Sequence, residues 1–146
     1  MMAIGEVLSE NVDTPDMLAQ RAELLAHALR LGEGMLRDQA ITSWIPGLNG
    51  AFAANGSVTA TSTRVEGLIA LYRSLPPDHQ ARSRVLNGIR LGLGFVLRTQ
   101  LKEGPMKGGF ADGAAPWRFA SEPRVRIDYV QHALAALVGY ARLRQP

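Results

Sequence analysis

An internal repeat limits what this chain can fold into more than any other feature of its sequence. The stretch 30–35, Arg-Leu-Gly-Glu-Gly-Met, returns sixty positions later as 90–95, Arg-Leu-Gly-Leu-Gly-Phe. Each copy is followed by an Arg-x-Gln triplet, a Gly/Pro-rich loop that ends in Gly-x-Phe-Ala, and a second apolar segment. In the two copies the triplets are 37–39 and 98–100, the loop ends are 50–53 and 108–111, and the apolar segments are 65–75 and 127–143. The recurrence of these features in the same order predicts stacked helical-repeat units.

The spacing of apolar residues predicts that the repeated segments are helices. One set lies at i, i+3, i+7, i+10, i+11 and i+15, which is one stripe of a long, half-exposed helix. Its members are Leu86, Ile89, Leu93, Val96, Leu97 and Leu101. Thr14-Pro15-Asp16 provides an N-cap, a first-position proline and an acidic first turn, so we expect a helix from there to about Gln39. Pro76-Pro77-Asp78 indicates the start of the next helix.

The second member of each copy reads as an inner helix. Residues 127–143 are apolar on nearly all sides, which predicts a helix packed against several neighbours. Capping boxes are expected at the starts of both inner helices, Thr63-x-x-Glu66 and Asp128-x-x-Gln131. Both starts should lie at the same end of the molecule. The glycines repeated in the outer helices predict close helix contacts, because each costs about 1 kcal/mol relative to Ala inside a helix. They are Gly32, Gly34, Gly92 and Gly94.

Composition excludes several classes of protein. The 146 residues are 47% apolar, enough for the core of a single domain, and they contain no cysteine for disulfides or thiolate metal sites. No secretory signal or bilayer-spanning run is present, which predicts a cytoplasmic chain away from the membrane. The net charge is +3, and the arginines are spread along the chain without a recognition motif, so nucleic acid is not an expected ligand. We expect a tail over 1–13 and one helical-repeat domain over 14–146.

The motif Phe95 to Gln100 followed by Gly108-Gly109-Phe110 resembles the QW repeat of the terpene cyclase and protein prenyltransferase α/α toroids. The first copy, 35–39 with 50–52, is a weaker match. The resemblance implies an all-α fold of two α/α-hairpin repeats, about 14–75 and 76–144. It also implies structural roles for four residues, with the glutamines bonding backbone and the aromatic rings packing nearby. These residues are Gln39, Gln100, Phe52 and Phe110.

The chain also departs from that family. It has two hairpins, whereas stacked repeats need about three or more to bury their faces. We therefore expect the chain to form a homo-oligomer or to complete a larger toroid. The clustered acidic motif of the cyclases is absent, and the inner-helix histidine is not accompanied by a cysteine. Neither a metal nor a cofactor is expected.

In a toroid, a ligand sits where the inner-helix N-termini and the Gly-rich loops converge. Asp128 and His132 are the acid/base candidates there. The candidate binding residues are Arg64, Glu66, Asp112, Trp117, Arg118, Arg126 and Tyr129. Structural alternatives stay open, because Glu66 and Asp128 also fit as caps, and His132 fits as a core histidine.

Two functions follow from this reading. The first is a non-catalytic helical-repeat domain that acts as the terminal part of a larger toroid or as an assembly and binding module. The second is a toroid-class enzyme that acts on a carbohydrate or isoprenoid-like substrate, with Trp117 as a stacking platform for the ligand. The long loop over 102–126 is the segment most expected to contact such a ligand.

Overall fold

The computed structural model describes residues 14–112 and 124–143, which form four α-helices. These are α2 (Pro15–Thr42), α3 (Val58–Ser74), α4 (Arg82–Arg98) and α5 (Ile127–Leu143). Outside the helices, the described part of the chain has two isolated β-bridges and no sheet. The all-α prediction is therefore confirmed.

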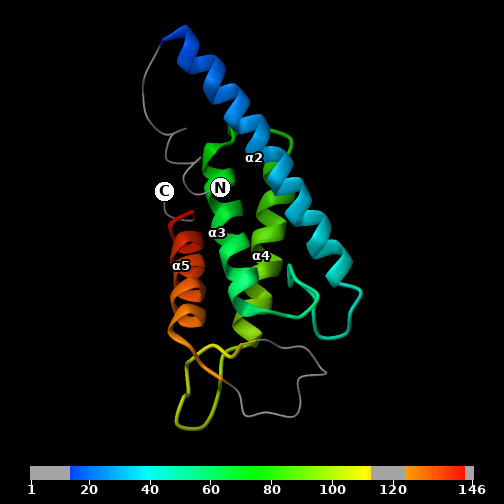
Figure 1. The fold of residues 1–146 in the computed structure, drawn as a ribbon, viewed down its shortest axis with the longest axis vertical. Coiled ribbons are helices and arrows are strands. Elements are labelled where there is room, and N and C mark those ends of the chain that lie inside the picture. Colours follow the sequence, from blue (N-terminus) through cyan, green and yellow to red (C-terminus); the bar gives the residue numbers. More distant parts are fainter. Residues whose placement is uncertain (1–13, 113–123, 144–146) are drawn as a thin grey trace.

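Helix α3 occupies the centre of the molecule and contacts the other three helices (Figure 1). Helices α3 and α5 lie side by side and run in the same direction, whereas α2 and α4 run the opposite way. Each consecutive pair is thus an antiparallel hairpin, and the two inner helices begin at the same end of the molecule. This arrangement agrees with the duplicated hairpin that the sequence predicts.

The main apolar core lies between α3 and its neighbours and draws buried side chains from all four helices. Its fully buried members include Ala28, Leu68, Leu71, Ile89 and Ala136. A smaller cluster, made of Val58, Val96, Phe110 and Ala133, closes the end of the molecule at which α3 and α5 begin. One continuous layer of apolar contacts thus joins both hairpins.

The helix boundaries agree with the sequence signals in part. Helix α2 begins at Pro15 after Thr14, as predicted, but continues past Gln39 to Thr42. Helix α5 has the predicted bounds. Helix α4 begins later than the Pro-Pro-Asp signal predicts, at Arg82, because residues 76–82 form two successive turns, His79 N to Pro76 O and Arg82 N to His79 O.

Both predicted capping boxes are wrong. Helix α3 begins at Val58, where the side chain of Ser57 accepts a hydrogen bond of 3.3 Å from Ala60 N. Thr63 lies one turn inside this helix, and its hydroxyl donates back to Thr59 O at 3.0 Å. Helix α5 begins at Ile127, so Asp128 lies within its first turn. Glu66 is therefore free for a contact other than capping.

The duplicated glutamines tie each outer helix to its following loop. Gln39 is buried and donates from Nε2 to Gly50 O and to Gly88 O, both at 3.0 Å. Gln100 donates to Gly108 O at 3.2 Å. Gly50 and Gly108 occupy equivalent places in the two Gly-x-Phe-Ala loop ends, and both phenylalanines of these loops are buried. The predicted backbone role of the glutamines is confirmed.

Two of the four repeated glycines mark close helix contacts. A Cβ at Gly32 would lie 2.5 Å from Leu71 Cδ2, and one at Gly92 would lie 2.5 Å from Val65 Cγ2. The prediction is wrong for Gly34, which has open space, and for Gly94, which meets only the flexible end of Arg98 at 3.8 Å. The first glycine of each pair faces α3, and the second, two residues later, points away because two positions in a helix differ by roughly 200°.

Among the described residues, helix α5 packs against α3 and, less extensively, against α4, and it leaves another side exposed, contrary to the prediction of a helix packed on nearly all sides. Its buried residues are Ala133 and Ala136. On its outer side Ile127, Leu134 and Val138 are 85%, 50% and 47% exposed. They lie at i, i+7 and i+11 and therefore form one apolar stripe. None of the helices in the two described ranges has the length and hydrophobicity required to cross a bilayer.

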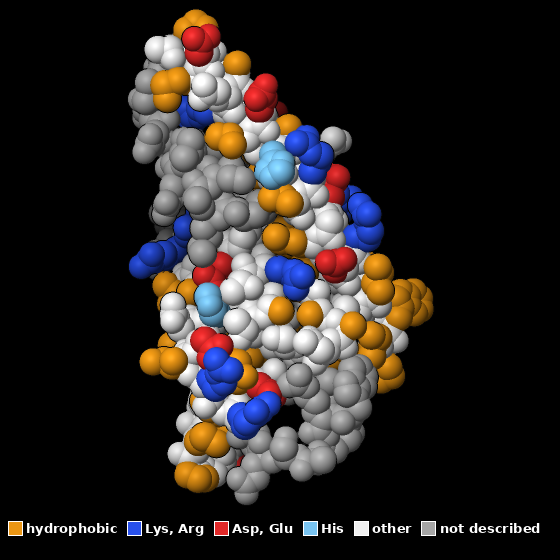
Figure 2. Space-filling model, viewed as in Figure 1, with side chains coloured by type: hydrophobic (Ala, Val, Ile, Leu, Met, Phe, Trp, Pro, Cys, Tyr) orange, Lys and Arg blue, Asp and Glu red, His pale blue; other side chains and the backbone are white. Residues whose placement is uncertain are grey.

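Apolar side chains also gather at the opposite edge. Figure 2 shows hydrophobic side chains clustered over the end of α2 and the loop that follows it. Ile41 is 61% exposed and Trp44 is 89% exposed there. The loop that carries Trp44 thus lies on the outer edge of the molecule, across α3 from α5 (Figure 1).

Candidate functional site

The contact surface between α3 and α5 brings two predicted site residues together. His132 Nδ1 lies 2.9 Å from Glu66 Oε1, the length of a hydrogen bond donated by an Nδ1–H to a carboxylate. Glu66 is buried and His132 is half-buried. The two inner helices are parallel neighbours (Figure 1), and the pair joins the ninth residue of α3 to the sixth residue of α5.

The chemistry of this pair follows from its geometry. A hydrogen bond from Nδ1 to a carboxylate fixes the orientation of an imidazole and leaves Nε2 as its second functional nitrogen. Such a pair is able to exchange a proton with a ligand that reaches Nε2. The carboxylate partner of His132 is Glu66 from the other inner helix, and not Asp128 of its own helix.

Two hydroxyl groups lie on the same face of α3 as Glu66. Ser62 precedes Glu66 by one turn and Thr59 by two turns. Both hydroxyl oxygens are buried and have no hydrogen-bond partner among the described residues. Buried polar groups are usually paired, so these two hydroxyls make the α3–α5 contact surface unusually rich in unused hydrogen-bonding capacity.

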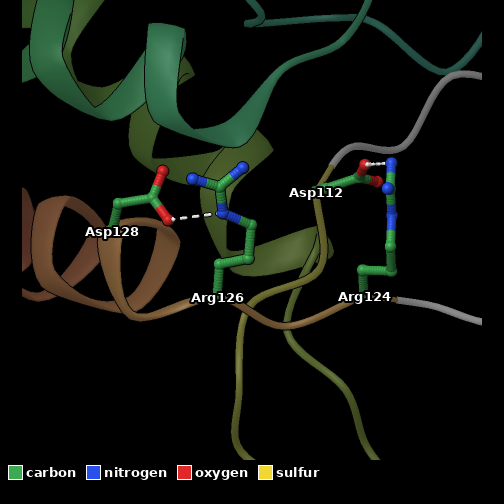
Figure 3. Close-up of polar contacts among 4 residues, drawn as sticks. All are labelled: Asp112, Arg124, Arg126 and Asp128. Carbon is green, nitrogen blue, oxygen red and sulfur yellow. Dashed lines mark hydrogen bonds and ion pairs between the residues drawn. The ribbon is translucent and has the colours of Figure 1, made fainter.

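Two ion pairs flank the segment that leads into α5. Arg124 Nη2 lies 3.0 Å from Asp112 Oδ2, and Arg126 Nε lies 3.0 Å from Asp128 Oδ1. Figure 3 shows both arginine side chains on the same side of this segment, as expected for residues two apart in an extended chain. Val125 between them bridges to Ala111, which fixes the segment against the second loop.

Arg126 also contacts Tyr129. Its guanidinium carbon lies 5.4 Å from the centroid of the Tyr129 ring, within the range of a cation–π interaction. Arg126, Asp128 and Tyr129 thus form one group at the start of α5, one turn before His132. Arg64 does not join them, since it is two positions before Glu66 and so points roughly 200° away around α3.

Trp117 and Arg118 lie outside the described residues, so their predicted contact with a ligand stays a prediction. Apart from Arg64, the remaining predicted residues fall into two neighbouring groups. Glu66 and His132 meet between α3 and α5, and the ion-paired group lies at the α5 start. Nowhere in residues 14–112 and 124–143 do three or more His, Cys, Asp or Glu side chains gather as a metal ion would require.

Sequence reasoning missed the pairing of Glu66 with His132, although it selected both residues. Glu66 was given both as a cap and as a binding candidate, and His132 was selected with Asp128 as an acid/base candidate because both belong to the cluster expected at one end of the molecule. The available signal was the repeat itself, because parallel inner helices place the early turns of α3 and α5 side by side. Ser62 and Thr59 carried no motif that would have selected them.

No family model, curated protein or solved structure matches this chain. The geometry described above is therefore the basis for any functional conclusion.

Proposed function

We propose that this chain is a helical-repeat assembly module whose α5 edge accepts a further helical hairpin. The observation that carries the proposal is the stripe of exposed apolar side chains along α5, formed by Ile127, Leu134 and Val138. Scattered apolar residues are normal on a protein surface, but a stripe that runs along one helix is typical of an interface.

The faces of the two inner helices support this proposal. Both helices have 17 residues, so they can be compared from first residue to first residue. Helix α3 contacts α5 through three residues. Glu66 bonds His132, Ile69 packs beside Gly139, and Arg73 donates to Gly139 O. The equivalent residues of α5 are 135, 138 and 142, and all three are exposed. The positions through which α3 contacts α5 are thus the same positions that are exposed on α5.

This correspondence fits a repeat protein that continues. In stacked repeats each unit buries the open face of the previous one. The partner is either a second copy of this chain or the remainder of a larger α/α toroid, the class that the Gln and Gly-x-Phe motifs resemble. We also propose a cytoplasmic location for the module.

Light scattering after size-exclusion chromatography, together with an apolar fluorescent dye, tests the proposal. We expect the wild-type chain either to exceed the monomer mass of 15.8 kDa or to bind dye as a monomer. Leu134→Glu should abolish the self-association or the dye binding, whichever the wild type shows. Its circular dichroism spectrum should stay that of the wild type, which shows that the helices are intact. Leu97→Glu, on the equally exposed surface of α4, is the matched control. A wild-type monomer that binds no dye would overturn the proposal.

A second candidate function is favoured by the Glu66–His132 pair. An imidazole held by Glu66, on a face of α3 that also carries two buried hydroxyls without a partner among the described residues, suits an enzyme that acts on a hydroxylated small molecule, such as a carbohydrate, or on an isoprenoid-like substrate with a polar head. Thermal-shift measurements with sugars, sugar acids and isoprenoid alcohols test this candidate. A ligand-induced shift that Glu66→Gln and His132→Gln remove would support it, and no shift with any of these probes would count against it.

A further inference from the structure

Resting on the proposed assembly function, we propose that the α5 edge is covered by the α5 of a second copy, with the two helices antiparallel. The stripe of Ile127, Leu134 and Val138 runs along most of the helix and is centred near Leu134. A two-fold axis close to Leu134 therefore places each stripe against the other. A closed two-fold dimer is also the commonest way for identical chains to bury one surface.

A head-to-tail stack of copies is disfavoured by α2. In such a stack, the α5 of one copy would pack against the α3 of the next copy. The α3 face used for this contact would be the one whose positions match the buried face of α5. In the first-residue alignment, Leu68 is the α3 equivalent of Leu137, which packs in the core. Helix α2 already covers this part of α3, because Gly32 packs directly on Leu71 and Leu68. The α5 of a second copy, in contrast, has its outer face free.

The charges at the two ends of α5 select the antiparallel direction. Arg142 extends the stripe into the last turn, four residues after Val138, and Asp128 lies in the first turn. Two antiparallel helices bring Arg142 of each copy to the Asp128 end of the other. Two parallel helices would instead bring the two Arg142 side chains together and leave neither with a carboxylate partner from the other α5. The helix dipoles favour the same antiparallel choice.

Asp128 has an oxygen available for this contact. Arg126 donates to Oδ1, and among the described residues no partner contacts Oδ2. The side chain of Asp128 is 36% exposed, so a second arginine has access to it. Arg142 is exposed, as an end-of-interface donor must be. In the last turn of α3, the equivalent Arg73 already reaches across to α5, where it donates to Gly139 O at 3.3 Å.

One helix pair buries less area than the roughly 1,200 Å² of a standard interface, so we expect a weak dimer that forms at high protein concentration. The chain contains no cysteine, so single cysteines report its geometry without background. A disulfide requires Cα atoms within about 7 Å of one another. Mixing Asp128→Cys with Arg142→Cys under mild oxidation should give a covalent dimer of the two variants at least fivefold more abundantly than either variant gives alone.

The outcomes separate this inference from the proposed function. If each single variant cross-links with itself and the mixture adds nothing, the helices are parallel and the antiparallel inference is wrong, although α5 would still be the docking edge. A monomer that binds dye through Leu134 would likewise overturn the dimer alone. Leu97→Cys on α4 is the control, and cross-linking of this variant as abundant as that of the mixture would overturn the assigned contact. Arg142→Glu should weaken self-association at least threefold, and Arg84→Glu, an exposed change on α4, should not.

Discussion

Glu66 Oε1 lies 2.9 Å from His132 Nδ1, and this contact joins the two inner helices across the interface between the hairpins. The residues are 66 positions apart in the chain. A buried carboxylate without a donor is costly, so the contact stabilises the α3–α5 interface in addition to orienting the imidazole.

Loss of the imidazole should destabilise the protein. His132→Ala leaves the buried Glu66 carboxylate without its donor, and we expect a loss of about 1–3 kcal/mol in the free energy of unfolding, measured in urea. His132→Gln retains a donor group and should cost less. His27→Ala is the control, because His27 is exposed on α2 and its Nδ1 lies 3.5 Å from Nη2 of the exposed Arg30. Equal losses for His132→Ala and His27→Ala would contradict the structural role of the pair.

The two repeat glutamines should differ in their contribution to stability. Gln39→Ala removes two buried hydrogen bonds, to Gly50 O and Gly88 O, and should cost about 2 kcal/mol at roughly 1 kcal/mol for each bond. Gln100→Ala removes two exposed bonds, one donated to Gly108 O and one accepted from Lys102 Nζ, and because both are exposed to water it should cost less than about 1 kcal/mol. Chemical denaturation of both variants measures the difference, and a Gln100→Ala loss as large as that of Gln39→Ala would show that burial does not set the effect.

The N-cap of α3 offers a direct test of where this helix begins. Ser57→Ala removes the oxygen that accepts from Ala60 N and should cost about 1 kcal/mol. Thr63→Ala should cost little or even stabilise the helix, because Thr63 is an exposed interior residue and alanine has the higher helix propensity. Thermal unfolding followed by circular dichroism compares the two variants. A larger loss of stability for Thr63→Ala than for Ser57→Ala would instead support a capping box at Thr63.

The fold was predictable because its signals are local or repeated. Helical spacing selected the segment 86–101, Thr14-Pro15-Asp16 marked the start of α2, and the duplicated glutamine and glycine positions identified two equivalent hairpins. The Thr63-x-x-Glu66 pattern misled because a threonine inside a helix also bonds its own backbone, here Thr59 O. A four-residue pattern does not distinguish these two situations.

The candidate site was less predictable because it depends on how helices pack. The register between α3 and α5 decides whether Glu66 meets His132, and no local pattern encodes this register. The number of neighbours around α5 has the same origin. Its sequence is apolar on nearly all sides, but the fold of the described residues leaves Ile127 and Leu134 exposed, and the spacing of apolar residues does not encode which sides become covered.

Alanine substitutions at the two glycines of α4 should have opposite effects on stability, because one position is closely packed and the other is not. A Cβ at Gly92 would lie 2.5 Å from Val65 Cγ2 and 3.0 Å from Phe52 Cε2, both in the buried core, so neither neighbour can move freely. We expect Gly92→Ala to cost about 1–3 kcal/mol, as overpacked core substitutions do. Gly94→Ala meets only the end of Arg98 at 3.8 Å and should stabilise the protein by up to about 1 kcal/mol through helix propensity. Urea unfolding of the two variants and of the wild type gives the sign of each change. If both alanines stabilised the protein, α4 would lie farther from α3 than the structure places it. The close helix contact predicted from the repeated glycine would then be wrong.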